Sequence, residues 1–186
     1  MAMLYDITLK ITTTMIRDAL VNEDIARSGH LGTHFDLMDK TFPLEYTRRK
    51  GIVFDVRGIR DREIGLGDVD LSRVEEGMFA AFCTGFMEEA GYGCSRYFRE
   101  HPVLSMDLIH ALVEKRVSII GIDAAGVRRG KEHTPTDQWC ADRGVFIVEN
   151  LSGLEPLVGK DDVIINTFPM NYVGLTGLPS RVIAEA

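Results

Sequence analysis

The order of apolar and helix-type segments between Met78 and Val148 constrains the fold of this chain more than any other feature. Three short apolar runs, 78–83, 117–122 and 145–148, have the length and composition of strands that are covered on both faces. Two segments with helical character separate these runs. A strand–helix–strand–helix–strand order is typical of α/β proteins, so we predict α/β architecture.

Both helices have characteristic N-terminal residues. Ser105 is a suitable N-cap for the first helix, because its hydroxyl can accept a hydrogen bond from a free backbone N–H. The second helix is predicted to start with Thr134 as N-cap and Pro135 as its first residue, which places Asp137 at the third helical position. Gly144 is expected to end this helix just before the third strand.

Further strands are predicted on both sides of this region. The runs that carry them are 4–12, 52–56, 163–168 and 181–184. No repeat, low-complexity segment or linker interrupts the 186 residues. We therefore predict a single domain that covers residues 1–186.

The composition excludes several classes of protein. The chain has 21 basic and 28 acidic residues, a net charge of −7, which disfavours binding to nucleic acid because such binding needs a basic surface. It has no run of 18 apolar residues, so no membrane span is expected, and its N-terminus lacks the pattern of a signal peptide. Three cysteines do not make a disulfide framework. We predict a cytoplasmic protein with a small-molecule substrate.

One segment has the residue types of a metal site. His30, His34 and Asp36 occur within seven residues. If 34–36 is extended, the side chains of His34 and Asp36 point to the same face, and Gly32 permits a turn that brings His30 towards them. Two imidazoles and a carboxylate are competent ligands for zinc, manganese or iron. The alternative is a loop with two surface histidines and an aspartate in a turn.

The segment HLGTHFD (30–36) resembles the metal-binding motif HxGTHxDxPxH of the cyclase family, which includes the kynurenine formamidases. Three later segments resemble family strands in the same order: 77–85, 117–124 and 144–154. The resemblance implies a compact α/β domain of the swivelling β/β/α type, with a mixed sheet flanked by helices. It also implies a homodimer or homotetramer.

The resemblance assigns metal ligands residue by residue. His30, His34 and Asp36 match three family ligands, and Glu149 matches a fourth. The metal expected from this match is divalent, zinc first and manganese second, with one or two ions per chain. An exposed position at the end of a strand is the alternative for Glu149.

Two positions depart from the family pattern. The last histidine of the motif, which transfers protons in the family, is replaced by Lys40. A further histidine ligand, twelve residues before the glutamate, is replaced by Asp137, whereas His133 lies four residues earlier. Asp137 is therefore either a ligand or a residue of the helix N-terminus, and Lys40 is either part of the site or a solvated side chain.

The charges of the two replacements suggest a single metal. With neutral imidazoles, the carboxylates of Asp36, Asp137 and Glu149 leave three negative charges, which one divalent ion and Lys40 would balance. Lys40 could then transfer protons if its pKa is lowered, with Glu149 or His133 as the other candidates.

Arg128 and Arg129 are candidate substrate-binding residues. They lie in a loop after a predicted strand, and an arginine fork could bind a substrate carboxylate. The alternative is a solvated basic turn.

The sequence thus predicts a metal-dependent hydrolase. The expected reaction cleaves a carbon–nitrogen bond of a small amide, N-formyl or cyclic amide substrate by means of a metal-activated water. The alternative is a relative without catalytic activity that binds a metal or a small anionic ligand, which the missing acid–base histidine suggests.

Overall fold

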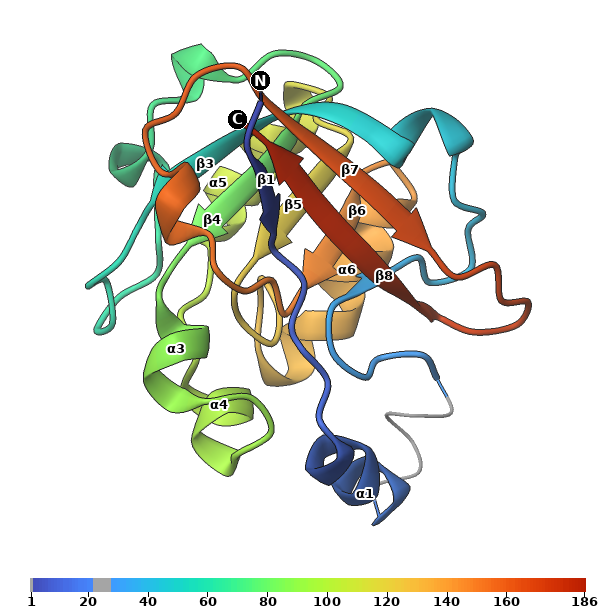
Figure 1. Ribbon diagram of the computed structural model, residues 1–186. Helices are drawn as coiled ribbons and strands as arrows, with labels where there is room; N and C mark the ends of the chain where they lie inside the picture. Colours follow the sequence, from blue (N-terminus) through green and yellow to red (C-terminus); the bar gives the residue numbers. More distant parts are fainter. Residues whose placement is uncertain (1, 22–27) are drawn as a thin grey trace.

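Eight strands form one mixed sheet in the computed structural model, which describes residues 2–21 and 28–186 (Figure 1). The strands are β1 (Leu4–Asp6), β2 (His34–Asp36), β3 (Arg48–Asp55), β4 (Phe79–Cys83), β5 (Ile119–Ile122), β6 (Phe146–Glu149), β7 (Val163–Pro169) and β8 (Gly177–Glu185). The predicted α/β architecture with a mixed sheet is confirmed.

The sheet closes on itself. Its strand order is β1-β8-β2-β6-β5-β4-β3-β7, and β7 also pairs with β8. This last pairing joins all the strands except β1 into a barrel-like ring, and β1 is attached outside the ring to β8. The neighbours from β3 to β6 are parallel, and the remaining pairs are antiparallel.

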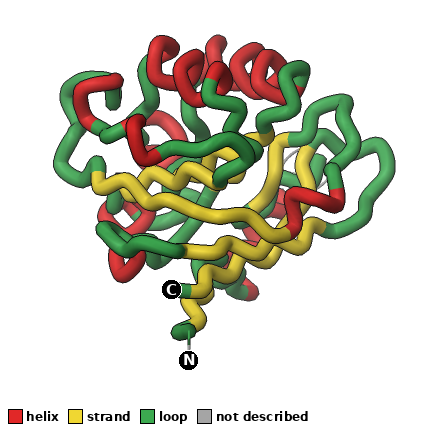
Figure 2. Tube along the Cα trace, turned by 90° about the horizontal axis from the view of Figure 1, so that it is seen from above, coloured by secondary structure: helices red, strands yellow, loops and turns green. Residues whose placement is uncertain are grey.

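The helices of the described residues are α1 (Thr13–Val21), α3 (Phe86–Ala90), α4 (Ser95–Glu100), α5 (Met106–Glu114) and α6 (His133–Ala141). In Figure 2 a row of helices lies along one side of the strand layer, and the two termini lie on the opposite side. The predicted cap of α5 is confirmed, because the Ser105 hydroxyl accepts a hydrogen bond of 3.2 Å from the Leu108 N–H. None of these helices has the length and apolar character needed to cross a membrane.

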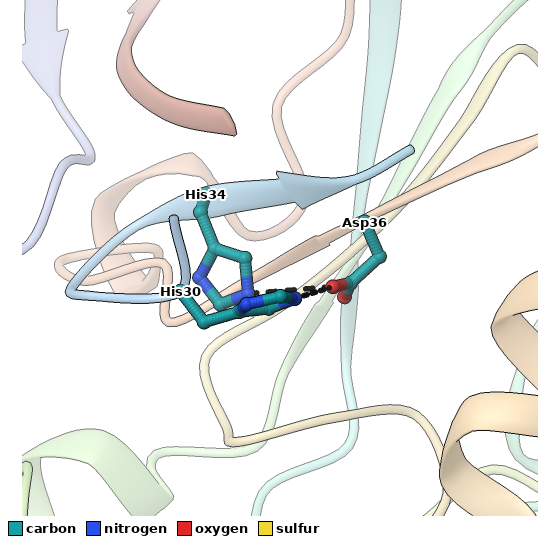
Figure 3. A group of neighbouring side chains, drawn as sticks. All are labelled: His30, His34 and Asp36. Carbon is teal, nitrogen blue, oxygen red and sulfur yellow. Dashed lines mark ion pairs between the residues drawn. The ribbon is translucent and has the colours of Figure 1, made fainter. Parts of the chain in front are cut away.

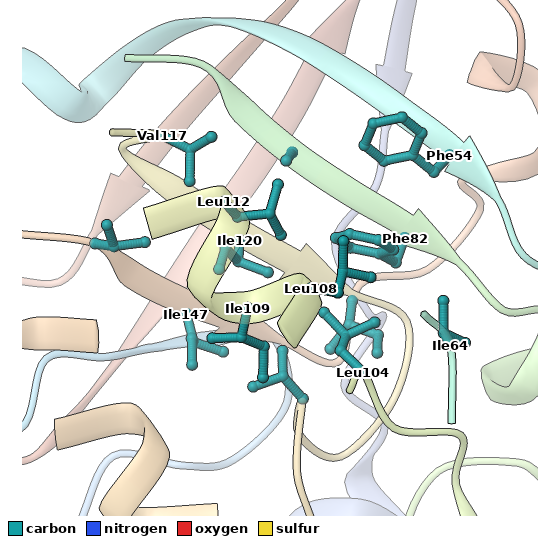
Figure 4. Close-up of a cluster of buried hydrophobic side chains, with 14 of the residues drawn as sticks. Phe54, Ile64, Phe82, Leu104, Leu108, Ile109, Leu112, Val117, Ile120 and Ile147 are labelled. Carbon is teal, nitrogen blue, oxygen red and sulfur yellow. The ribbon is translucent and has the colours of Figure 1, made fainter. Parts of the chain in front are cut away.

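Two hydrophobic clusters cover the opposite faces of the central strands. In β4, Ala80 and Phe82 pack in one cluster with α5, which Figure 4 shows around Phe82. Phe79 and Ala81 pack in the other cluster, with side chains from the remaining strands of the ring. Because strand side chains alternate between faces, both faces of this strand are buried. This explains why the central runs are continuously apolar.

The start of α6 corrects one prediction. The helix begins at His133 rather than after Thr134, because the 3-10 helix η4 (Gly130–Glu132) leads directly into it. Pro135 lies in the first turn, where backbone N–H groups have no partner within the helix, so its missing N–H costs nothing. Asp137 is thus one full turn into the helix.

Other differences concern lengths and short elements. The predicted strand 4–12 is regular only over Leu4–Asp6, whereas β3 and β8 are longer than the predicted runs 52–56 and 181–184. The helices α1, α3 and α4 were not predicted; α3 and α4 are at most six residues long and have too few turns to show a clear period.

Candidate metal centre

Strand pairing brings the first site residues together. His34 and Asp36 both lie on β2, two residues apart, so their side chains share one face. The antiparallel pairing of β2 with β6 sets His34 directly opposite Glu149, the last residue of β6. His34 Nε2 lies 3.5 Å from Asp36 Oδ1 and 3.6 Å from Glu149 Oε2.

A glycine turn returns His30 to the same place. Gly32 has φ +74°, a left-handed conformation that favours glycine, as its place between the histidines predicts. His30 Nε2 lies 3.0 Å from Asp36 Oδ1, and Figure 3 shows both imidazoles directed at this carboxylate. The extended conformation of 34–36 and the convergence of the three side chains therefore agree with the metal-site interpretation, and a surface-loop arrangement does not occur.

Helix α6 supplies two further side chains. His133 and Asp137 are separated by four residues, which places both on one face of the helix. His133 Nε2 lies 2.7 Å from Glu149 Oε1 and 3.2 Å from Asp137 Oδ2. The sequence left open whether Asp137 or His133 lies at the site. In the structure both side chains lie in the cluster.

Two groups of potential ligands result, and they share one carboxylate. The first contains His30, His34 and Asp36, and the second contains Asp36, His133, Asp137 and Glu149. Within each group the ligand atoms lie within 4.8 Å of one another. Zinc bonds to imidazole nitrogen and carboxylate oxygen are about 2.0–2.2 Å long, so two ligands of one ion lie at most about 4.4 Å apart. The 4.8 Å limit of each group is close to this spacing.

Hydrogen bonds fix the orientation of the first two imidazoles. His34 Nδ1 donates to the Gly32 carbonyl at 2.8 Å, and His30 Nδ1 lies 2.8 Å from the Ser28 hydroxyl. In both rings Nε2 is therefore the nitrogen directed at Asp36. A partner on the second nitrogen is the usual arrangement of a histidine that binds metal.

The buried ionisable groups of the cluster strongly shift one another's pKa values. Burial opposes a charged imidazole, but Asp36 and Glu149 outweigh it and raise the pKa of His34 to about 9. Burial and the charge of Asp36 raise the pKa of Asp137 and of Glu149 well above their usual values. Burial also acts against ionised Asp36, yet His34 and His30 hold the pKa of Asp36 below its usual range.

The residues present fit a divalent cation. In the part of the chain that the structure describes, three buried side-chain atoms of the cluster have no hydrogen-bond partner: His34 Nε2, Asp36 Oδ2 and Asp137 Oδ1. Burying carboxylates without a cation or donors is costly, and a bound cation offsets that cost. Imidazole and carboxylate are the donors that zinc and manganese accept.

Lys40 lies outside the cluster. Its ammonium is 2.9 Å from Asp39 Oδ1 and 2.7 Å from Asp142 Oδ1. Hydrogen bonds to Asp142 and Asp39 raise the pKa of Lys40, whereas proton transfer near neutral pH needs a lowered one. The structure therefore does not support Lys40 as the catalytic residue. The argument for a single metal also fails, because it needed the positive charge of Lys40 within the cluster.

The two arginines differ. Arg128 is buried, and its guanidinium bonds Glu63, Glu132 and the Leu104 carbonyl, so it has a structural role rather than the predicted substrate-binding one. Arg129 is exposed and lines a cavity of about 280 Å³ beside the cluster. Other residues that line the cavity are His30, His34, Phe98, His101, Ala125, Gly130, His133, Glu149 and Asn150.

Two residues that support the site were not among the sequence candidates. At Gly126, a Cβ atom would lie 3.1 Å from Glu149 Oε1 and 3.2 Å from His133 Cε1, so only glycine leaves these side chains in place. Asn150 Nδ2 donates to the Gly32 carbonyl at 2.9 Å and braces the turn. Asn150 directly follows Glu149 in the sequence, which was the available signal for it.

Comparison with known proteins identifies relatives. The family model named "Cyclase" matches residues 5–129, which include the first ligand group. Among curated protein sequences, no significant match is found. A structure described as a potential metal-dependent hydrolase with cyclase activity has a TM-score of 0.77 and 24% identity, and the match covers 100% of this chain and 98% of that chain.

Two further structures share the fold. One is described as a predicted metal-dependent hydrolase from Bacillus stearothermophilus, with a TM-score of 0.74, 23% identity, and coverage of 100% of this chain and 98% of that chain. The other is an isatin hydrolase bound to the product analogue thioisatinate, with a TM-score of 0.72, 19% identity, and coverage of 83% and 71%. At these identities the similarity establishes the fold.

Proposed function

The chain belongs to the cyclase family, and on this basis we propose that it is a metal-dependent hydrolase of a carbon–nitrogen bond in a small amide, N-formyl or cyclic amide. One observation carries the proposal: imidazoles and carboxylates gather in two groups that share Asp36, and three buried atoms of these side chains have no hydrogen-bond partner among the described residues. Two similar structures described as a potential and a predicted metal-dependent hydrolase, and a third described as an isatin hydrolase, support this choice of reaction.

The cluster would hold one or two divalent ions per chain, zinc first and manganese second. When bound, such an ion lowers the pKa of a water molecule and polarises a substrate carbonyl. His30, His34 and Asp36 form one ligand group, and His133, Asp137 and Glu149 complete the other with Asp36. The cavity beside the cluster would admit the substrate.

Proton transfer is assigned to Glu149. This carboxylate lines the cavity, and burial and Asp36 raise its pKa well above the usual value. A cation bound in the second group would keep Glu149 ionised, and an ionised carboxylate at the cavity can accept a proton and return it to the leaving amine. Its 2.7 Å contact with His133 Nε2 holds one of its oxygens in place.

A second candidate function is binding without hydrolysis. It is favoured by one observation, that Lys40 replaces the family's proton-transfer histidine and pairs with Asp39 and Asp142 instead of entering the cluster. In that case the cavity would bind a small anionic ligand through Arg129.

A substrate screen separates the two functions. Purified protein loaded with zinc or manganese is incubated with N-formyl anilines, small anilides and cyclic amides, and the products are quantified by chromatography. Hydrolysis by the metal-loaded protein, lost in the Asp36→Ala variant and after chelation, is the expected result. Bound metal with no turnover of any substrate would favour the second function, and turnover by Asp36→Ala would contradict the assigned site.

A further inference from the structure

His101 lines the cavity beside the ligand cluster, and one of its ring nitrogens has no hydrogen-bond partner among the described residues. The residue is 1% exposed and lines the cavity together with Arg129 and Phe98. Its Nδ1 lies 3.3 Å from the Pro102 carbonyl oxygen. No described residue makes a hydrogen bond to its Nε2, so this nitrogen is left for whatever occupies the cavity.

The hydrogen bond to Pro102 fixes the chemical character of this nitrogen. A carbonyl oxygen only accepts, so Nδ1 carries the proton and Nε2 has a free lone pair in the neutral ring. Burial and the neighbouring Arg129 lower the pKa of His101 to about 3, so the ring is neutral at physiological pH. His101 therefore offers the cavity a hydrogen-bond acceptor. It belongs to neither ligand group.

The remaining walls of the cavity have different chemistry. Arg129 Nη1 donates to the Arg99 carbonyl at 3.0 Å, and its Nε and Nη2 have no partner among the described residues. Phe98, which is 39% exposed, lines the same cavity. The cavity thus combines one neutral acceptor, one cationic donor and one aromatic face.

We propose that His101 is a specificity-determining residue whose Nε2 accepts a hydrogen bond from the amide N–H of the substrate, while Arg129 pairs with an anionic group. A ligand with oxygen or carbon in place of the N–H leaves Nε2 without a hydrogen-bond donor. In an ester, the lone pair of the oxygen would also repel the lone pair of Nε2. A site built to bond an N–H discriminates against an analogue that lacks it. The inference rests on the proposed function for the nature of the scissile bond, but its prediction concerns binding.

Two matched probes test the inference. The first is 3-acetamidobenzoate, and the second is 3-(2-oxopropyl)benzoate, in which CH₂ replaces the N–H. Their affinities for zinc-loaded protein are measured by equilibrium dialysis with chromatographic detection of the intact compounds. The wild type should bind the amide about 3- to 10-fold more tightly, as expected for one neutral hydrogen bond. Equal affinities, or no binding of either probe at millimolar concentration, would overturn the inference.

Two variants assign the preference to His101. His101→Asn keeps a donor near Pro102 but has no acceptor in the place of Nε2, so the preference for the amide should disappear. His101→Gln keeps an acceptor near that place and should retain most of the preference. A purely structural role of His101 would instead weaken both probes equally, and this result would contradict the assignment. Arg129→Gln should weaken both carboxylates equally and leave the preference unchanged.

The same samples separate this inference from the proposed function. Hydrolysis of the amide without any preference in binding would overturn the role of His101 alone. Preferential binding of an amide that stays intact would support the role of His101 and count against hydrolysis.

Discussion

At the scale of single residues, Lys40 shows how a motif position can lose its role. It occupies the place of the family's proton-transfer histidine, but its side chain pairs with Asp39 and with Asp142, the C-cap of α6. A lysine needs burial or a nearby cation to lower its pKa, and here two carboxylates act in the opposite direction.

We therefore predict that Lys40→Ala retains the bound metal and most of the turnover. The loss in stability should be small, because surface ion pairs contribute little. Metal content, kcat/KM and urea unfolding of the variant check this. A drop in kcat/KM of about 100-fold with intact metal would return Lys40 to the mechanism.

His101 gives a pH-dependent prediction. Its pKa is about 3 in the folded protein, below the ordinary value of 6.5, so the unfolded chain binds the additional proton between these values. The stability that the neutral ring provides is therefore fully present above pH 6.5 and is lost as the pH falls towards 3.

Urea unfolding at pH 7 and pH 4 measures this effect. The wild type should lose on the order of 3 kcal/mol relative to His101→Asn over this range. The matched control is His110→Asn on the exposed side of α5, which should follow the wild type. An equal loss in wild type and His101→Asn would show that the ring is not buried in its neutral form.

The first ligand group was predictable because it is local. His30, His34 and Asp36 lie within seven residues, so strand alternation and one glycine turn suffice to bring them together. Glu149 required the family resemblance, because its contact with His34 depends on the pairing of β2 with β6. The ion pairs of Lys40 depend on the position of α6 and could not be derived from the motif.

At the scale of secondary structure, α6 replaces the missing family histidine. Asp137 stands at the histidine position, but His133 lies one turn earlier on the same helix and reaches Glu149. Four residues of separation in a helix return a side chain to the same face. The helix already begins at His133, so this side chain lies on the same helix face as Asp137.

Moving the imidazole from position 133 to position 137 tests whether His133 takes the place of the family histidine. We predict that His133→Ala weakens metal binding at the second group by at least about tenfold, since second-group geometry depends on this imidazole. Adding Asp137→His to His133→Ala should restore binding, because it returns an imidazole to the family position. Metal titration with an indicator chelator measures both variants, and unchanged affinity in His133→Ala would remove His133 from the ligand set.

At the scale of the whole molecule, closure of the sheet creates the site. The sequence predicted the central strands and the helices between them, because their signals are local and periodic. It did not predict that β7 pairs with both β3 and β8 to close the ring, since strand order depends on contacts between distant segments. Within the ring, β2 lies between β6 and β8, and this place sets His34 against Glu149.

The predicted homo-oligomer also belongs to this scale. Apolar side chains are exposed on the segment that connects β7 and β8, where Met170 and Tyr172 are about half exposed and Val173 is 96% exposed. Exposed apolar patches often mark interfaces. Light scattering should give a mass of at least twice 20.8 kDa, and Val173→Asp should shift it towards the monomer, whereas Leu66→Asp should not. A monomeric wild type would contradict this prediction.

Elemental analysis of the purified protein tests the central claim most directly. After incubation with zinc or manganese and removal of free metal, the wild type should retain one or two equivalents per chain. Asp36→Ala, which removes the carboxylate shared by both groups, should retain less than about a tenth of an equivalent, while Lys40→Ala retains the wild-type amount. A wild type that binds no metal, or an Asp36→Ala variant that binds as much as the wild type, would contradict the account.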